Sequence, residues 1–213
     1  MQPLIQVYYS FIDPNMPEAL FRQHLQQLPS SIQEDVLRYH QRADQLRVLM
    51  GKILLQKALA GAGFSPGLIS ELQYSEYKRP FIAGAMDFNI THSGNCVALA
   101  AGSNMKVGID VEAVHPIKPE DILAVLRDEE LHDMQQDNAT PETILRFWTR
   151  KEAIVKASGE GLFMQPQSIY FTDELTAAAQ GKTWHLHELD MGAPYIAYCA
   201  TNLPNAAVQI EQV

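Results

Sequence analysis

The sequence predicts an α+β fold with two similar lobes, each made of a helix and a three-stranded sheet. The main observation behind this prediction is that the order helix, strand, strand, strand occurs twice along the chain. A second observation is the stretch of small and polar residues at 102–106, which marks the best internal boundary. We therefore expect an N-terminal lobe at residues 1–104 and a C-terminal lobe at residues 105–213.

The first lobe opens with MQPLIQVYYSFID, in which apolar and polar residues alternate as they do in a strand. Residues 31–61 are predicted to be one helix, because Ser31 and Glu34 form a capping box and Gly61 is a suitable stop. Its leucines give this helix a wide apolar face. Strand signals follow at ELQYSEY, DFNITHS and CVALAAG, with YKRP as a proline-containing loop between the first two.

The second lobe repeats this plan after the strand GIDVE at 108–112. Thr140 is a good N-cap and Pro141 a good first helical residue, so a helix should run from 141 to about 158 and end at Gly159. Strand signals follow at SIYFT, KTWHLHEL and PYIAYCAT. A shift of 103 positions superposes Arg47 on Arg150 and Cys96 on Cys199.

The composition fits a globular protein and argues against several classes. The formal net charge of −9 argues against broad nucleic-acid binding, which needs a basic surface. The apolar runs fall short of the roughly 18 residues of a membrane helix, and the opening residues lack a basic leader. The two cysteines are too distant in sequence for a zinc cluster. We expect a cytoplasmic protein without nucleic-acid or membrane partners. Its basic residues occur in local groups, and such groups permit the binding of small anionic ligands.

The GIDVE strand places Asp110 and Glu112 on one face, roughly 7 Å apart, where two carboxylates repel unless water or a cation screens them. On the second helix, Trp148, Glu152 and Lys156 are spaced i, i+4 and i+8 and share a face. Alone, Glu152 and Lys156 are typical of an ordinary surface pair. Together with the strand, three carboxylates and a lysine indicate a magnesium site that also holds phosphate.

These motifs resemble the signatures of the 4′-phosphopantetheinyl transferase superfamily. GIDVE matches the family strand G-[IV]-D-[IVL]-E, and WTRKEAIVK at 148–156, followed by GEGL, matches W-x-x-K-E-A-x-x-K. FNITHS at 88–93 matches a third signature, and the resemblance covers roughly residues 38–200. The mid-chain position of GIDVE resembles the surfactin-synthetase-activating (Sfp-like) group. That resemblance implies a monomeric pseudodimer, with two lobes related by a pseudo-twofold axis and the active site between them.

The resemblance implies transfer of 4′-phosphopantetheine from coenzyme A to a serine of an apo acyl or peptidyl carrier protein, releasing adenosine 3′,5′-bisphosphate. It assigns Mg²⁺, with Mn²⁺ as the alternative, to Asp110, Glu112 and Glu152. Glu152 is the implied base for the serine, Lys156 and His92 face the pyrophosphate, and Lys151 assists. The 3′-phosphate and adenine are assigned to Arg47, Lys78 and Arg79, and the backbone near Thr91 lines the nucleotide. By its residue type alone, His92 is more often a structural hydrogen-bonding group than a catalyst.

Some features depart from the family pattern and leave alternatives open. The segment SSIQED lacks the basic residues that some members carry before the first long helix, and YKRP lacks a glycine that many relatives have. Which of Lys78 and Arg79 contacts coenzyme A therefore stays open. A magnesium-dependent hydrolase or nucleotidyl transferase, and a non-catalytic module that binds coenzyme A or a carrier, are the rival readings. The identity of the carrier and the acceptance of acyl-CoA also stay open, and residues 113–140 are expected to contribute to carrier contact.

Overall fold

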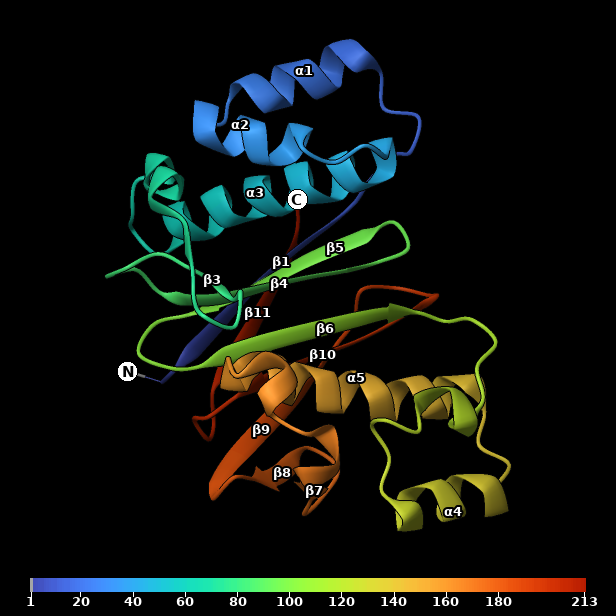
Figure 1. Ribbon diagram of the computed structural model, residues 1–213. Coiled ribbons are helices and arrows are strands. Elements are labelled where there is room, and N and C mark those ends of the chain that lie inside the picture. Colours follow the sequence, from blue (N-terminus) through green and yellow to red (C-terminus); the bar gives the residue numbers. More distant parts are fainter. Residues whose placement is uncertain (1) are drawn as a thin grey trace.

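The computed structural model describes residues 2–213, which are layered as helices, sheet, sheet and helices (Figure 1). One buried cluster lies between the first three helices and the first sheet, and another lies between the second sheet and the long C-terminal helix. A third cluster, which includes Val7, Ala98, Ile109 and Cys199, lies between the two sheets. The sheets therefore bury their inner faces against each other and their outer faces under helices.

The first sheet has the strand order β11–β1–β5–β4. Its strand β1 (Leu4–Phe11) runs antiparallel to β5 (Cys96–Gly102), which in turn pairs antiparallel with the edge strand β4 (Asp87–Ser93). Strand β11 (Ala207–Gln212) pairs with β1 in parallel. The last strand of the chain thus belongs to the sheet of the N-terminal lobe, while the lobe boundary at 104 and 105 stays a prediction.

The second sheet has the order β6–β10–β9–β8–β7, and all of its paired strands are antiparallel. Its edge strand β6 is the predicted GIDVE strand. A small ribbon of β2 and β3 projects from the first lobe. The strands are β2 (Gln73–Tyr74), β3 (Pro80–Phe81), β6 (Val107–Ala113), β7 (Tyr170–Phe171), β8 (Thr176–Ala179), β9 (Lys182–Leu189) and β10 (Tyr195–Thr201).

The predicted single helix at 31–61 is wrong, because the structure has α2 (Ser30–Leu37) and α3 (Arg42–Gly61) with a break between them. The backbone is extended at Gln41, and Gln45 donates a side-chain hydrogen bond to the Tyr39 carbonyl across the break. A continuous helix of that length would span about 46 Å. The break lets α2 fold back and bury Ile32 and Val36 in the core. The preceding helix α1 (Glu18–Gln26) was not predicted.

The second long helix, α5 (Pro141–Ser158), has the predicted boundaries. The Thr140 hydroxyl accepts a hydrogen bond from the Thr143 amide at 3.3 Å, and Gly159 ends the helix with a φ of 78°. The preceding helix α4 (Asp128–Gln136) lies within the stretch from 113 to 140. No helix among residues 2–213 is long and apolar enough to cross a membrane.

The two-lobed α+β prediction is confirmed, but the predicted three-stranded sheets are wrong, because the two sheets have four and five strands. The repeat also has a different register. Helix α5 begins 99 residues after α3, and β10 begins 99 residues after β5, so the shift of 103 was a chance match. Strands β8 and β11 were both missed. The sequence of β8, TAAA, has no apolar alternation, whereas β11 does alternate at Val208 to Glu211 but is short and largely exposed. Of the predicted strand ELQYSEY, only two residues form a strand, β2, and both are exposed.

Candidate active site at the seam between the lobes

The two lobes meet where β4 and β6 lie side by side, and we call this junction the seam. The two strands are joined by side chains of β4, which accept hydrogen bonds from backbone amides of β6. In an ordinary strand pair the acceptors would be backbone carbonyls. Each amide belongs to a residue 20 positions after its acceptor in the sequence. Asp87 accepts from Val107 at 2.8 Å, Asn89 from Ile109 at 2.9 Å, and Ser93 from Ala113 at 3.0 Å. The seam therefore fixes the register of one lobe on the other.

Alternation along β6 turns its acidic residues toward α5. Val107, Ile109 and Val111 enter the core between the sheets, so the intervening Gly108, Asp110 and Glu112 face the helix. Contact at Gly108 is close, because a Cβ atom added there would lie 2.2 Å from the Ala153 carbonyl oxygen. Glycine at this position lets α5 approach the strand closely enough to bring its own side chains over the acids.

Asp110 is the centre of the site. Its side chain is buried, and its Oδ1 accepts hydrogen bonds from Lys156 Nζ at 2.5 Å and from Thr91 Oγ1 at 3.3 Å. Lys156 Nζ also donates to Thr91 Oγ1 at 3.0 Å. Burial raises the pKa of Asp110 to about 7; Lys156 opposes this shift, and Glu112 and Glu152 add to it. Asp110 Oδ2 is buried and has no hydrogen-bond partner among residues 2–213.

Glu112 and Glu152 flank Asp110 from the strand and from the helix. Glu112 accepts a hydrogen bond from Ser93 Oγ at 2.8 Å. Burial raises the pKa of Glu152; Lys156 opposes this shift and Glu112 adds to it. Within the described part of the chain, no three His, Cys, Asp or Glu side chains are already grouped as a metal site. The buried and unpaired Oδ2 of Asp110, with two further carboxylates nearby, offers oxygen atoms of the type that a hard cation takes as ligands.

His92 and Arg47 lie at the end of the seam where β4 turns into β5. Arg47 comes from α3, and its Nε and Nη2 each donate to the Gly94 carbonyl at 3.2 Å. His92 is exposed, and partial desolvation together with the positive charges of Arg47 and Lys156 lowers its pKa. Arg47 and Lys156 are thus both near enough to act on His92, while the side-chain contacts of Arg47 itself are with Gly94 and Asp44.

A cavity of about 390 Å³ lies between Glu152 on α5 and the loop that carries Lys78 and Arg79. Glu152 and Lys156 lie at its α5 wall, and Lys78 is exposed on the opposite wall. The residues that line it also include Tyr77, Asn89 and Met164. The cavity therefore connects Glu152, which the sequence assigned to the metal, with Lys78 and Arg79, which it assigned to the nucleotide.

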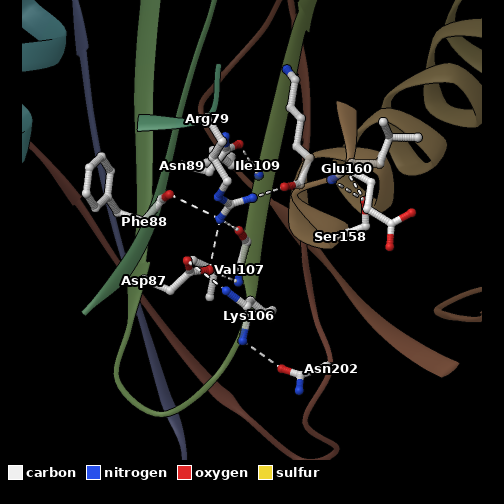
Figure 2. A network of polar contacts seen from close by, with 12 residues as sticks. Arg79, Asp87, Phe88, Asn89, Lys106, Val107, Ile109, Ser158, Glu160 and Asn202 are labelled. Carbon is white, nitrogen blue, oxygen red and sulfur yellow. Dashed lines mark hydrogen bonds and ion pairs between the residues drawn. The ribbon is translucent and has the colours of Figure 1, made fainter. Parts of the chain in front are cut away.

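Two of the sequence-assigned residues point elsewhere. Lys151 is fully buried, and its Nζ donates to the Val125 carbonyl at 2.9 Å and to Glu130 at 2.8 Å, beneath α4. The guanidinium of Arg79 lies across the seam and donates to protein acceptors (Figure 2). Sequence reasoning also missed the seam itself. Its polar residues lie within DFNITHS, but the constant offset of 20 residues becomes meaningful only when the lobes are placed together.

Comparisons with known proteins give matches in both lobes. The family described as "4′-phosphopantetheinyl transferase superfamily" matches residues 106–200, and the family described as "4′-phosphopantetheinyl transferase, N-terminal" matches residues 13–104. The two matched segments meet close to the boundary predicted from the sequence. The matched second segment contains β6 and α5, which carry all three carboxylates and Lys156.

Individual relatives carry the same name. A "4′-phosphopantetheinyl transferase gsp" from Aneurinibacillus migulanus is 30% identical over 146 residues, covering 68% of this chain and 61% of the relative. A Bacillus subtilis 4′-phosphopantetheinyl transferase is 32% identical over 134 residues, covering 61% and 59%. The match thus spans about three fifths of the length of these two relatives. A "4′-phosphopantetheinyl transferase HetI" from Nostoc sp. is 29% identical over 200 residues, covering 86% and 82%. The chain belongs to the 4′-phosphopantetheinyl transferase superfamily.

Proposed function

We propose that the protein transfers 4′-phosphopantetheine from coenzyme A to a serine hydroxyl of an apo acyl or peptidyl carrier protein. The observation that carries this proposal is the seam site, where Asp110, Glu112, Glu152 and Lys156 from one lobe meet Thr91 of the other beside a cavity. A diphosphate substrate needs oxygen ligands for a metal and a cation for the remaining charge, and this arrangement offers both. The family membership and the names of the relatives support the same reaction.

The residues that would hold Mg²⁺, or Mn²⁺ in its place, are Asp110, Glu112 and Glu152. The buried and unpaired Oδ2 of Asp110 supports this assignment, because such an oxygen is costly unless something binds it. A bound divalent cation supplies positive charge to the pyrophosphate oxygens. Lys156 places its ammonium group against Asp110 and lines the cavity, where it would balance charge on the leaving phosphate.

Glu152 is the group we assign as the base for the carrier serine. Its raised pKa makes the carboxylate a better proton acceptor than an exposed glutamate, and it lines the cavity. The serine oxygen would form a bond to the phosphorus that carries the pantetheine arm. The bond from that phosphorus to the bridging oxygen breaks, so adenosine 3′,5′-bisphosphate leaves. The serine proton passes to Glu152, directly or through water.

The nucleotide end of coenzyme A is assigned to the cavity and the adjoining turn. Lys78 lies exposed on the cavity wall, on the loop that meets the Asp87 end of β4, and is placed to meet a phosphate there. Arg47 and His92 lie at the other end of the seam, where β4 turns into β5. The backbone around Thr91 would line the nucleotide. These positions support the assignments made from the sequence, which remain proposals for each residue.

We further assign the protein to the Sfp-like group, as a monomer that acts in the cytoplasm without nucleic-acid or membrane partners. The seam supports the monomer, because both sides of the site come from one chain. Residues 113–140, with α4, are the segment to which we assign carrier contact. The carrier served, and the acceptance of acyl-CoA, are left to experiment.

Intact-protein mass spectrometry tests the proposal. An apo carrier protein is incubated with the enzyme, coenzyme A and magnesium, and a parallel sample contains EDTA. We expect the carrier to gain one phosphopantetheine arm in the first sample and none in the second. If carriers from fatty-acid and peptide synthesis both stay unmodified while coenzyme A still binds, the non-catalytic module becomes the better reading.

A further inference from the structure

Arg79 is the residue whose contacts the proposed function leaves unexplained. It lies just before β3, in the loop that also carries Lys78, and its side chain is 12% exposed. Its Nη2 donates to Asp87 Oδ2 at 2.8 Å, to the Phe88 carbonyl at 3.2 Å and to the Val107 carbonyl at 2.8 Å, while its Nη1 donates to the Lys156 carbonyl. Figure 2 shows the guanidinium at the centre of this network. One side chain therefore joins β4, β6 and α5.

Three of the four acceptors of Arg79 are backbone carbonyl groups that need a partner, and the fourth is the Asp87 carboxylate. Phe88 belongs to the edge strand β4, and Val107 opens the edge strand β6 that faces it. Lys156 is among the last four residues of α5, whose carbonyls have no partner within the helix. A cation at a helix C-terminus is also favoured by the helix dipole. Arg79 of the first lobe therefore caps the catalytic helix of the second.

The capped residue is itself the proposed catalytic lysine. The Lys156 carbonyl is held by Arg79, and its Nζ is held by Asp110 and Thr91. Asp87, which orients Arg79, also accepts from the Val107 amide and so belongs to the seam. The position of the lysine along the seam is thus determined from both of its ends.

A phosphate of coenzyme A would compete poorly for this guanidinium. To take over the terminal nitrogens, the phosphate would have to displace these carbonyl acceptors, and each buried acceptor left without a partner costs free energy. Lys78 and Arg79 both line the cavity, but Lys78 is exposed, so it offers a cation without that cost.

We propose that Arg79 is a positioning residue, which fixes the last turn of α5 and thereby holds Lys156 in register with Asp110 across the seam. The part of this proposal that concerns the effect of Arg79 on turnover rests on the proposed function, whereas the part that concerns the capping of α5 does not. This role differs from direct contact with the 3′-phosphate or adenine, which is the role that the family resemblance implies for Arg79. In this proposal Lys78, which is exposed at the cavity, makes the direct contact instead.

The test compares Arg79→Met and Arg79→Lys with wild type, and Arg22→Met serves as the control. Arg22 is an exposed arginine of α1 that pairs with Glu18, far from the seam. Three quantities are measured on each folded protein: amide hydrogen exchange across residues 155–160, the Kd for coenzyme A by calorimetry, and kcat with KM for carrier modification. Arg79→Lys keeps a cation and remains informative if Arg79→Met does not fold. Asp87→Asn gives a second route, since it removes the carboxylate that orients the guanidinium.

We expect faster exchange at the end of α5, a kcat lower by roughly tenfold to a hundredfold, and a Kd within about threefold of wild type. Arg79→Lys should lie between Arg79→Met and wild type. A Kd raised by about tenfold or more with kcat retained would make Arg79 a ligand contact and overturn the proposal. Unchanged kcat per folded molecule, or unchanged exchange at the end of α5, would overturn it as well.

The exchange and calorimetry arms need no turnover. If wild type binds coenzyme A but modifies no carrier, the proposed function has failed, while faster exchange in Arg79→Met still supports the capping of α5. If wild type is active and exchange is unaltered by the substitution, the proposal about Arg79 has failed and the proposed function stands.

Discussion

Replacing Gly108 by alanine tests whether close contact between α5 and β6 builds the site. The added Cβ would lie 2.2 Å from the Ala153 carbonyl oxygen, 2.3 Å from the Ala157 amide nitrogen and 2.8 Å from the Ala157 Cα. All three neighbours are backbone atoms of a helix, so no side chain can rotate away. To restore an ordinary contact, α5 has to move from the strand by about 1 Å.

That displacement should damage both stability and chemistry. Overpacking in a core typically costs about 1–3 kcal/mol, and a backbone clash on a long helix should lie at the upper end. Because Glu152 and Lys156 move with the helix while Asp110 stays on the strand, turnover should fall by roughly a hundredfold. Urea unfolding measures the first effect, and carrier modification per folded molecule measures the second.

Gly67→Ala is the matched control for this substitution. The added Cβ there would meet the Ser65 hydroxyl oxygen at an ordinary distance of 3.5 Å, so stability should change by less than about 0.5 kcal/mol. If Gly108→Ala were as stable and active as Gly67→Ala, the reasoning that places α5 directly on β6 would be refuted.

Three further substitutions or conditions give shorter tests. Lys151→Met should lower the free energy of unfolding in urea by about 3 kcal/mol, because it removes a buried partner of Glu130. A variant of wild-type stability that has lost transfer would instead support direct assistance by Lys151. Burial raises the pKa of both Cys96 and Cys199 to about 12, from 9.0 in an unfolded chain. Since the unfolded thiols ionise first, stability should fall as the pH rises from about 9 to about 12. At pH 8 the folded protein should resist a thiol reagent, and rapid labelling would contradict this burial. Magnesium with coenzyme A should raise the Tm of wild type, and Asp110→Asn should abolish the part of the rise that depends on magnesium.

Much of the fold was visible in the sequence because its signals are local. The boundaries of α5 follow from Thr140, Pro141 and Gly159, which lie within one stretch of chain and act on that stretch alone. The strands at DFNITHS and CVALAAG are similarly set by their own composition. The break between α2 and α3 was missed because it depends on tertiary contacts, among them the Arg42 guanidinium 3.5 Å above the Phe21 ring.

The residue types of the site were predictable from the sequence, but the hydrogen bonds of the seam that hold the two lobes together were not. The acids on β6 and the Glu152–Lys156 pair follow from strand and helix periodicity, and the structure brings Lys156 to Asp110. The seam joins residues 20 positions apart through side chains, and no local pattern marks such a pairing. For the same reason the sequence could not distinguish the buried guanidinium of Arg79 from the exposed ammonium of Lys78.

The most direct test of the central claim is transfer by Asp110→Ala and Glu152→Ala, with Glu142→Ala as the control. Glu142 is an exposed acid in the first turn of α5, remote from the seam. Intact mass of an apo carrier should show no phosphopantetheine gain with either seam variant and a normal gain with Glu142→Ala, while circular dichroism shows all three folded. Turnover at the wild-type rate in a folded Asp110→Ala or Glu152→Ala protein would contradict the assignment of the chemistry to this seam.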